Sequence, residues 1–92
     1  MKTCFTILAL LLSTAVASAS CVIAQNRGGG VVFINECPYS VILTYDSSSV
    51  GKGGIGPLGA GQEEMSAVPA GDHVEWWVCG YDDWVNSSCS LP

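Results

Sequence analysis

The chain has 92 residues, enough for one small domain, and its eight Asp and Glu residues outnumber three Lys and Arg to give a formal net charge of −5. A protein of that sign repels phosphate backbones and anionic lipid head groups. Nucleic-acid binding and membrane disruption by a cationic face are therefore not expected.

The first 19 residues have the features of a secretory signal peptide. Lys2 supplies a positive charge, residues 5–12 are almost entirely apolar, and Ala17-Ser18-Ala19 is the small-x-small pattern that signal peptidase accepts. A membrane anchor is the alternative, but the run from Phe5 to Ala19 is shorter than the roughly 20 residues of a spanning helix. We predict cleavage after Ala19, which leaves a single secreted, extracellular domain of residues 20–92 with no membrane segment.

The predicted domain keeps four cysteines, an even number in an oxidising compartment: Cys21, Cys37, Cys79 and Cys89. We therefore expect two disulfides, because no C-x-x-C pair of a zinc site is present. A domain of this size is marginal on hydrophobic burial alone, and each bridge adds roughly 2–4 kcal/mol. Four cysteines allow three connectivities, and loop-closure entropy varies too slowly with length to choose between them.

The first part of the domain has the pattern of strands. Residues 31–35 (VVFIN) and 40–46 (SVILTYD) are rich in β-branched and aromatic side chains, which predicts a hairpin or two sequential strands. Pro38 lies in the turn between them, where it prevents continued ladder pairing. Residues 47–61 (SSSVGKGGIGPLGAG) then predict a long, mobile, glycine-rich loop, whose glycines lack the spacing of a phosphate-binding loop.

Two more strands are predicted in the second half. Residues 62–68 form the third, closed by a Pro69-Ala70-Gly71 turn, and residues 73–79 alternate as the fourth. The alternation places Val74, Trp76 and Val78 on one face, and Glu75, Trp77 and Cys79 on the other. No window predicts an amphipathic helix of useful length, and a last strand in residues 86–92 is left open. The fold class is mostly β.

A spaced set of short segments resembles the N-terminal part of thaumatin-like proteins. The segments are Asn35-Glu36-Cys37-Pro38-Tyr39-Ser40-Val41, the glycine-rich stretch, Leu58-Gly59-Ala60-Gly61-Gln62, Val68-Pro69-Ala70-Gly71 and Trp76-Trp77. The chain is also similar to small fungal secreted proteins of the yeast-phase-specific type, which carry a reduced version of this pattern. The resemblance covers about residues 31–79.

The resemblance implies a small, disulfide-stapled antiparallel β-sandwich, secreted by a fungus that interacts with a host. It also implies a pairing, Cys37 with Cys89 and Cys21 with Cys79. The chain is much shorter than a full thaumatin-like protein and lacks the segments that supply the acidic cleft associated with glucan binding or cleavage. That activity is therefore not carried over.

The sequence offers few residues that could form a catalytic site or a metal site. A glycoside hydrolase needs two carboxylates across one sugar, and Glu63, Glu64, Asp82 and Asp83 are available, but neighbouring surface acids are usually solvated charges. His73 is the only imidazole, and no second histidine stands at metal-ligand spacing. We expect a protein without enzymatic activity, cofactor or metal.

The tryptophans carry the functional prediction. Trp76 and Trp77 must point to opposite faces of a strand, so Trp76 is the expected core residue and Trp77 the exposed one. Trp77, Tyr81 and Trp84 then form a candidate exposed aromatic group, rimmed by Asp82 and Asp83. In the alternative, Trp84 folds back over Trp77 and covers it.

The sequence therefore predicts an effector-like or surface-interaction protein that binds a host protein or a cell-wall polysaccharide. The predicted contact residues are Trp77, Tyr81, Asp82, Asp83 and Trp84. Asn86-Ser87-Ser88 is an N-glycosylation sequon, so Asn86 is a candidate modification site. The main rival is a carbohydrate-binding module for β-glucan or chitin that uses the same aromatics, and a glucan hydrolase is a remote third.

Overall fold

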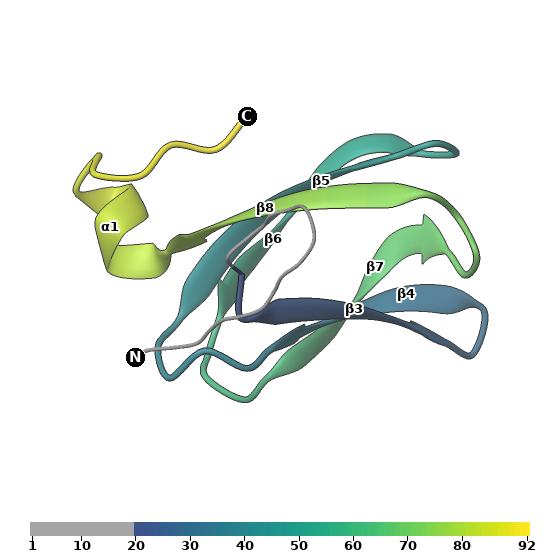
Figure 1. Ribbon diagram of the computed structural model, residues 1–92, viewed down its shortest axis with the longest axis horizontal. Coiled ribbons are helices and arrows are strands. Elements are labelled where there is room, and N and C mark those ends of the chain that lie inside the picture. Colours follow the sequence, from purple (N-terminus) through teal and green to yellow (C-terminus); the bar gives the residue numbers. More distant parts are fainter. Residues whose placement is uncertain (1–19) are drawn as a thin grey trace, which may run out of the picture.

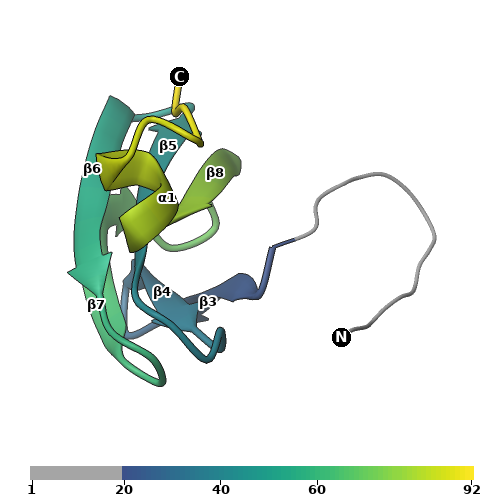
Figure 2. The same cartoon turned by 90° about the vertical axis from the view of Figure 1, so that its left-hand side faces the viewer.

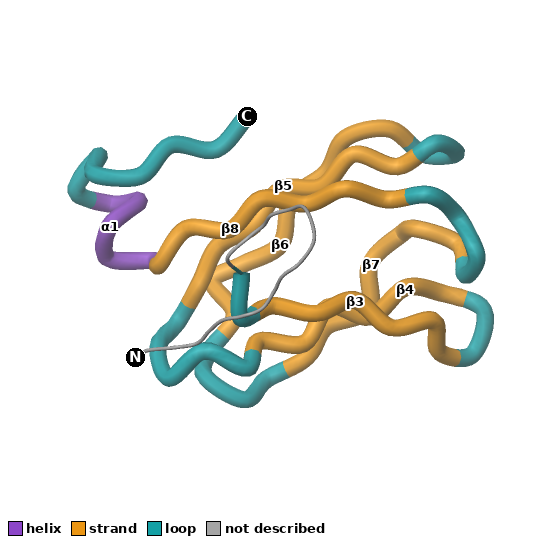
Figure 3. The backbone as a smooth tube through the Cα atoms, in the orientation of Figure 1, coloured by secondary structure: helices purple, strands orange, loops and turns teal. Residues whose placement is uncertain are grey.

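The computed structural model describes residues 20–92, and the predicted signal peptide and its cleavage site after Ala19 lie outside that description. Within it the chain is mostly β, as predicted (Figure 3). The elements are β3 (Val22–Arg27), β4 (Gly30–Asn35), β5 (Val41–Ser47), β6 (Gly51–Leu58), β7 (Glu63–Pro69), β8 (Val74–Gly80) and the short helix α1 (Tyr81–Val85). Residues 86–92 form no strand.

The strands form two antiparallel sheets with the orders β3-β4-β7 and β6-β5-β8. Figure 1 shows β5 and β8 above β3 and β4, and Figure 2 shows β6 continuing into β7 along one side of the two layers. The predicted strands at residues 31–35 and 40–46 are both present as β4 and β5. They are sequential strands rather than a hairpin, because each belongs to a different sheet.

Apolar side chains from the two facing surfaces form the core between the sheets. Its buried members are Val22, Val31, Phe33, Cys37, Val41, Leu43, Tyr45, Ile55, Leu58 and Val68. Phe33 stacks on Tyr45 with ring centroids 5.7 Å apart and meets the edge of Trp76 at 5.6 Å. The Trp76 indole N–H donates to the carbonyl oxygen of Val22 at 3.2 Å, so this half-buried side chain joins the edge strands β8 and β3.

The prediction of a mobile loop over residues 47–61 is wrong, because most of this segment forms strand β6. It pairs with β5 in an antiparallel ladder, and only a short turn follows Ser47. The Tyr45 ring occupies the space beside Gly53 that a side chain would need, so an aromatic residue of the neighbouring strand supplies the missing apolar cover. Gly53 therefore makes room for a side chain of β5, and the glycines of this segment do not indicate a mobile loop.

A register shift in β6 explains why its pattern does not alternate. Leu43 pairs with Ile55 and Val41 with Leu58, so β6 contains one more residue than β5 over this stretch. The extra residue lies at Gly56-Pro57 and lets Ile55 and Leu58, three positions apart, both point into the core. A bulge of this kind removes the period-2 signal that identifies a strand from sequence.

Strand β3 was not predicted. Its register with β4 is complete, from Val22 opposite Asn35 to Arg27 opposite Gly30. The second half of β3 is polar and exposed because β3 is an edge strand, with β4 as its only neighbour in the sheet. A polar edge of this kind discourages pairing with other chains.

The disulfides join Cys21 to Cys37 and Cys79 to Cys89. Two disulfides were expected, but the pairing implied by the thaumatin-like resemblance, Cys37 with Cys89 and Cys21 with Cys79, is wrong. Cys21 precedes β3 and Cys37 follows β4, and the register of these strands brings the two Cα atoms to 5.1 Å. Cys79 and Cys89 meet with Cα atoms 5.9 Å apart because α1 reverses the chain after β8.

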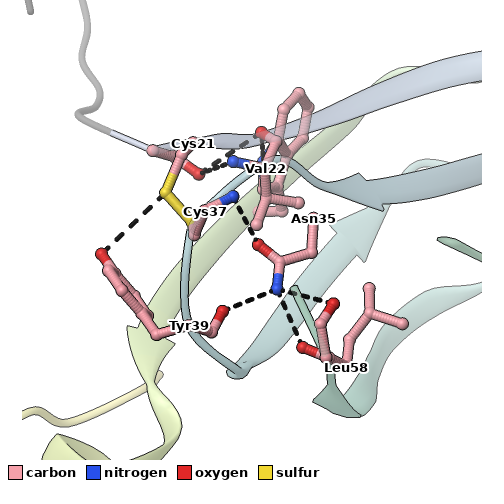
Figure 4. The surroundings of a disulfide bond; sticks show 9 residues. Cys21, Val22, Asn35, Cys37, Tyr39 and Leu58 are labelled. Atoms are coloured by element: carbon pink, nitrogen blue, oxygen red, sulfur yellow. Dashed lines mark hydrogen bonds between the residues drawn. A yellow bond between two sulfur atoms is a disulfide. The ribbon is translucent and has the colours of Figure 1, made fainter. Parts of the chain in front are cut away.

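Asn35 organises the end of the sandwich next to the first disulfide (Figure 4). The side chain is fully buried, and its amide nitrogen lies 2.9 Å from the carbonyl oxygens of Tyr39 and Leu58 and 3.0 Å from that of Gly59. Its amide oxygen accepts a hydrogen bond from the backbone N–H of Cys37 at 2.9 Å. One side chain therefore joins the connection that follows β4 to the loop that follows β6.

Asp72 has the corresponding role at the opposite ends of the strands. Its carboxylate accepts hydrogen bonds from the hydroxyls of Ser48 and Ser49, both at 2.7 Å, and from the backbone N–H of Ser49 at 3.0 Å. The bond from the Ser48 hydroxyl is the largest influence, and together these bonds lower the pKa of Asp72 below its ordinary value of 3.8. The carboxylate thus links the turn after β7 to the turn after β5.

Acid unfolding tests this link. Because the pKa of Asp72 is lower in the folded protein than in the unfolded chain, its contribution to stability is present above the ordinary carboxyl pKa and disappears as pH falls through the lower native value. We expect the wild-type melting temperature to fall more steeply between about pH 4 and pH 2 than that of Asp72→Asn. Glu64→Gln, which removes an exposed carboxylate on β7, should keep the wild-type slope. Equal slopes for all three proteins would contradict the role of Asp72.

Candidate functional site

The structure separates the five predicted contact residues into two neighbouring groups. Trp77 lies on the outer face of β8 and is 40% exposed, opposite Thr44 of β5. Tyr81, Asp82, Asp83 and Trp84 belong to α1, which follows directly. Trp84 is 41% exposed and its ring lies 6.2 Å from that of Tyr81. Trp77 thus belongs to the sheet, and the four residues of α1 form a helix group in which the rings of Tyr81 and Trp84 lie near each other.

The helix group is held in place by its flanking contacts. The backbone N–H of Tyr81 donates to the carbonyl oxygen of Ser40 at 2.9 Å, and the disulfide from Cys79 ties down the segment after the helix. Asp82 and Asp83 occupy the first turn of α1, where negative charge suits the partial positive charge of a helix N-terminus. Their position has a structural explanation that does not involve a ligand.

We call the outer surface of the β6-β5-β8 sheet the Trp77 face. It is formed by Ile42, Thr44 and Asp46 of β5, Lys52 and Gly54 of β6, and Glu75, Trp77 and Cys79 of β8, which alternate with core residues along each strand. Cys79 pairs with Ile42, is only 1% exposed and is bonded to Cys89, so the second disulfide lies at one end of this face. The registers arrange these residues in cross-strand rows. One row is Lys52, Asp46 and Glu75, and the next is Gly54, Thr44 and Trp77.

Gly54 leaves the sheet backbone bare two strands away from Trp77. It is exposed, and a Cβ atom at this position would lie 3.4 Å from the carbonyl oxygen of Leu43, which is an ordinary contact. Gly56 differs, because its φ of +136° and a Cβ only 3.0 Å from the Cα of Ile42 both require glycine. Gly54 is therefore an exposed strand glycine that no steric contact in the described chain demands.

Thr44 lies between Gly54 and Trp77 in the same row. Its hydroxyl oxygen is buried and has no hydrogen-bond partner within residues 20–92. The methyl group is turned toward Gly54, 3.9 Å from where a Cβ of that residue would be. Sequence reasoning identified Trp77 but missed its row partners. The signal that would have found Gly54 is its place in register with Thr44, which only the strand pairing reveals.

Polar side chains cover part of the outer surface of the other sheet, on which Met65 is 53% exposed. Arg27 at the end of β3 binds the carboxylate of Glu63 at the start of β7, and its second guanidinium nitrogen donates to Gln25. This link crosses the sheet above Val32, which is only 4% exposed although it faces away from the core. On the Trp77 face the indole of Trp77 is 40% exposed, whereas Cys79 is buried.

Candidate metal ligands do not cluster among the described residues. No cluster of three or more His, Cys, Asp or Glu side chains with metal-binding geometry occurs in residues 20–92. His73 lies 3.7 Å from Glu75, and both side chains are largely exposed. The candidate carboxylates are divided between β7, where Glu63 pairs with Arg27, and α1.

Asn86 lies at the C-terminal end of α1 and is exposed, as are Ser87 and Ser88 of the predicted sequon. A glycan at this position would project into solvent beside Trp84. Glycosylation itself stays a prediction.

No protein-family model matches this chain, and comparison with curated proteins and with solved structures finds no significant match. Of the helices in residues 20–92, none is long and apolar enough to cross a membrane. The functional argument therefore depends on the two disulfides, the sandwich and its exposed aromatics.

Proposed function

We propose that this chain is a secreted, non-enzymatic protein that acts by binding a host protein or a cell-wall component, as an effector or surface-interaction protein does. The observation that carries the proposal is that Trp77 and Trp84 stay 40% and 41% exposed. A domain this small has little apolar area available for its core, so two indoles left in water favour a contact role.

The proposal includes secretion of the protein and its relationship to thaumatin-like proteins. The two disulfides suit an oxidising compartment, and together with the signal-peptide pattern of residues 1–19 they support secretion. The antiparallel two-layer arrangement is compatible with the resemblance to thaumatin-like proteins and to small fungal secreted proteins. We propose these as the relatives of the chain.

A binding role is favoured over catalysis because the candidate carboxylates lie on separate elements, β7 and α1. Glu63 is paired with Arg27, and Asp82 and Asp83 stand in the first turn of α1. A hydrolase would need one carboxyl with a raised pKa facing a second across a sugar. The carbohydrate-binding module is the rival function, and the exposed Trp77 with bare backbone in its row is the observation that favours it.

Retention on isolated cell walls tests the proposed function. The oxidised protein is mixed with fungal and plant cell walls, each untreated or stripped of protein by protease, and the bound fraction is measured by sedimentation. We expect retention on at least one preparation, and at least a tenfold loss in the double variant Trp77→Ala/Trp84→Ala. Met65→Ala is the matched control, because Met65 is an exposed apolar residue on the other sheet.

Each outcome has a distinct meaning. Retention that survives protease treatment supports a polysaccharide partner, and retention that is lost supports a protein partner. No retention on any preparation would overturn the binding role. Release of soluble sugars that stops in Asp82→Asn or Asp83→Asn would overturn the non-enzymatic assignment and favour a hydrolase.

A further inference from the structure

We propose that two copies of this chain associate along the free edge of β8, with the two β8 strands antiparallel and the two Trp77 indoles opposite each other at the centre. The β6-β5-β8 sheets of the two copies then form one continuous sheet. The inference goes beyond the proposed function and does not depend on it, because Trp84 lies on α1 and not on this edge.

Strand β8 lies at the edge of its sheet, and β5 is its only strand partner among residues 20–92. Figure 2 shows β8 on the side of the two layers opposite to β6 and β7. Figures 1 and 2 together show α1 past the end of β8 and not beside its outer edge. That edge is therefore accessible to another strand.

The hydrogen bonds to β5 determine which backbone groups of β8 point outward. The N–H of Ser48 donates to the carbonyl oxygen of His73 at 3.0 Å, at the start of β8. Because hydrogen-bonded and non-hydrogen-bonded pairs alternate in an antiparallel ladder, the odd-numbered residues of β8 bond to β5. The N–H and C=O groups of the even-numbered residues point to the free edge, and no backbone hydrogen bond within residues 20–92 reaches them. These residues are Val74, Trp76, Val78 and Gly80.

The other three sheet edges have features that hinder pairing with another chain. The second half of β3 is polar and carries Arg27, β6 has the bulge at Gly56-Pro57, and β7 begins with Glu63 and ends with Pro69. Strand β8 has no proline, a ladder with β5 without register shifts, and a single charged residue, Glu75. A regular edge strand of this kind is a template for strand addition.

A two-fold axis at Trp77 gives the best register of this edge with a second copy. Trp77 is the middle residue of β8, which spans Val74–Gly80. In this register Val74 meets Gly80 and Trp76 meets Val78, each twice by symmetry, which gives about eight hydrogen bonds. Moving the axis by one residue loses about two of them. The edge is therefore complementary to itself, which favours a second copy as its partner.

The side chains also suit this register. The two Trp77 side chains meet at a non-hydrogen-bonded position, where cross-strand side chains approach most closely and aromatic pairs are favourable. Each indole is 40% exposed, so the pairing removes apolar surface that one copy leaves in water. Glu75 lies opposite Cys79 of the second copy, so no like charges of β8 oppose each other. An axis at Glu75 would place two carboxylates directly opposite.

The size of the contact predicts a weak dimer. Seven residues make an edge about 23 Å long, and its pairing buries a few hundred Å² on each copy, less than the roughly 800 Å² per partner of a standard interface. Residues 20–92 contain two basic and eight acidic residues, a net formal charge of −6, so two copies repel each other at low salt. We expect a Kd of about 100 μM.

Sedimentation equilibrium of the oxidised protein from about 10 μM to about 1 mM tests the association. We expect a monomer–dimer equilibrium that shifts toward the dimer between about 0.05 M and about 0.5 M NaCl, because salt screens the repulsion between the copies. Trp77→Lys places two ammonium groups opposite each other and should weaken the dimer at least tenfold. Trp84→Lys is the matched control and should keep the wild-type Kd, because Trp84 is 41% exposed but lies on α1.

Two cysteine variants test the register. In Trp77→Cys the new thiols of the two copies lie opposite each other, close enough for a disulfide, so a covalent dimer should form in a glutathione redox buffer. In Glu75→Cys the two thiols are about 13 Å apart along the ladder, too far to be bridged. This variant should therefore form no covalent dimer. A covalent dimer of Glu75→Cys but not of Trp77→Cys would overturn the inference.

The remaining outcomes separate this inference from the proposed function. Each variant is first checked for its two native disulfides by peptide mapping and for a cooperative thermal transition. A wild-type protein that stays monomeric up to about 1 mM would overturn the inference, as would a dimer that Trp84→Lys disrupts and Trp77→Lys does not. Retention of such a monomer on cell walls would leave the proposed function intact. A dimer that no cell wall retains would support the inference and overturn only the external binding role.

Discussion

Asn35→Ala is expected to lower the free energy of unfolding by about 3 kcal/mol, because several buried polar groups lose their partner at once and each unsatisfied group costs about 1–3 kcal/mol. The amide of Asn35 reaches three carbonyl oxygens and one backbone N–H in a site without solvent exposure. Urea unfolding at pH 7 measures the change. The loss should be accompanied by a lower melting temperature.

Two variants control this result. Asn26→Ala removes an exposed asparagine with one hydrogen bond, to the backbone N–H of Gly71, and should cost about 1 kcal/mol or less. Asn35→Asp keeps the acceptor for the Cys37 N–H but turns an oxygen toward three carbonyl oxygens. It should destabilise more than Asn35→Ala at pH 7 and recover partly in acid, where a protonated carboxyl can donate. Equal costs for Asn35→Ala and Asn26→Ala would refute the organising role of Asn35.

Removing the first disulfide is the second large effect. The double variant Cys21→Ala/Cys37→Ala should lose about 3 kcal/mol, the value expected for a closed loop of this length. The two cysteines are 16 positions apart and join the outer ends of β3 and β4. Because the domain is small, we expect a clear fall in the urea midpoint under oxidising conditions. An unchanged midpoint would show that the bridge adds nothing to stability.

Peptide mapping with trypsin under non-reducing conditions tests the Cys21–Cys37 bond that this variant removes. Arg27 and Lys52 are the only tryptic sites in residues 20–92, so cleavage produces fragments 20–27, 28–52 and 53–92. The observed pairing links fragment 20–27 to fragment 28–52 and leaves 53–92 with an internal bridge. The pairing implied by the resemblance would instead hold all three fragments together. A single three-fragment species would therefore contradict the structure.

Strand positions were predictable where local pattern and final packing agree. In β4, β5 and β8, β-branched and aromatic residues mark the strands, whereas the Pro69-Ala70-Gly71 turn marks the end of β7. The observed bounds of all four strands lie within one residue of those predicted. In β8 the adjacent residues Trp76 and Trp77 divide between core and surface because the side-chain period of a strand is two. That division is a local property of extended backbone.

The sequence pattern did not identify a strand where a neighbouring strand supplies the apolar side chains that the segment itself lacks. In β6 the Tyr45 ring covers Gly53, and the bulge at Gly56-Pro57 turns both Ile55 and Leu58 inward, so neither glycine content nor alternation reveals the strand. The row of Gly54, Thr44 and Trp77 was missed for the same reason, because only the strand pairing brings these residues together. The resemblance to thaumatin-like proteins stays a prediction, and the disulfide pairing drawn from it was wrong.

The sequence by itself determined the mostly β class, the presence of two disulfides and the opposite orientations of Trp76 and Trp77, because each depends on residue type, cysteine number or the alternation of a single strand. Only the tertiary structure decided that β4 and β5 lie in different sheets, which cysteines pair, and that the rings of Tyr81 and Trp84 lie near each other on α1. These features depend on which distant segments meet. Contacts of that kind are selected by the packing of the whole core and the satisfaction of buried groups such as Asn35, neither of which is encoded in any one segment.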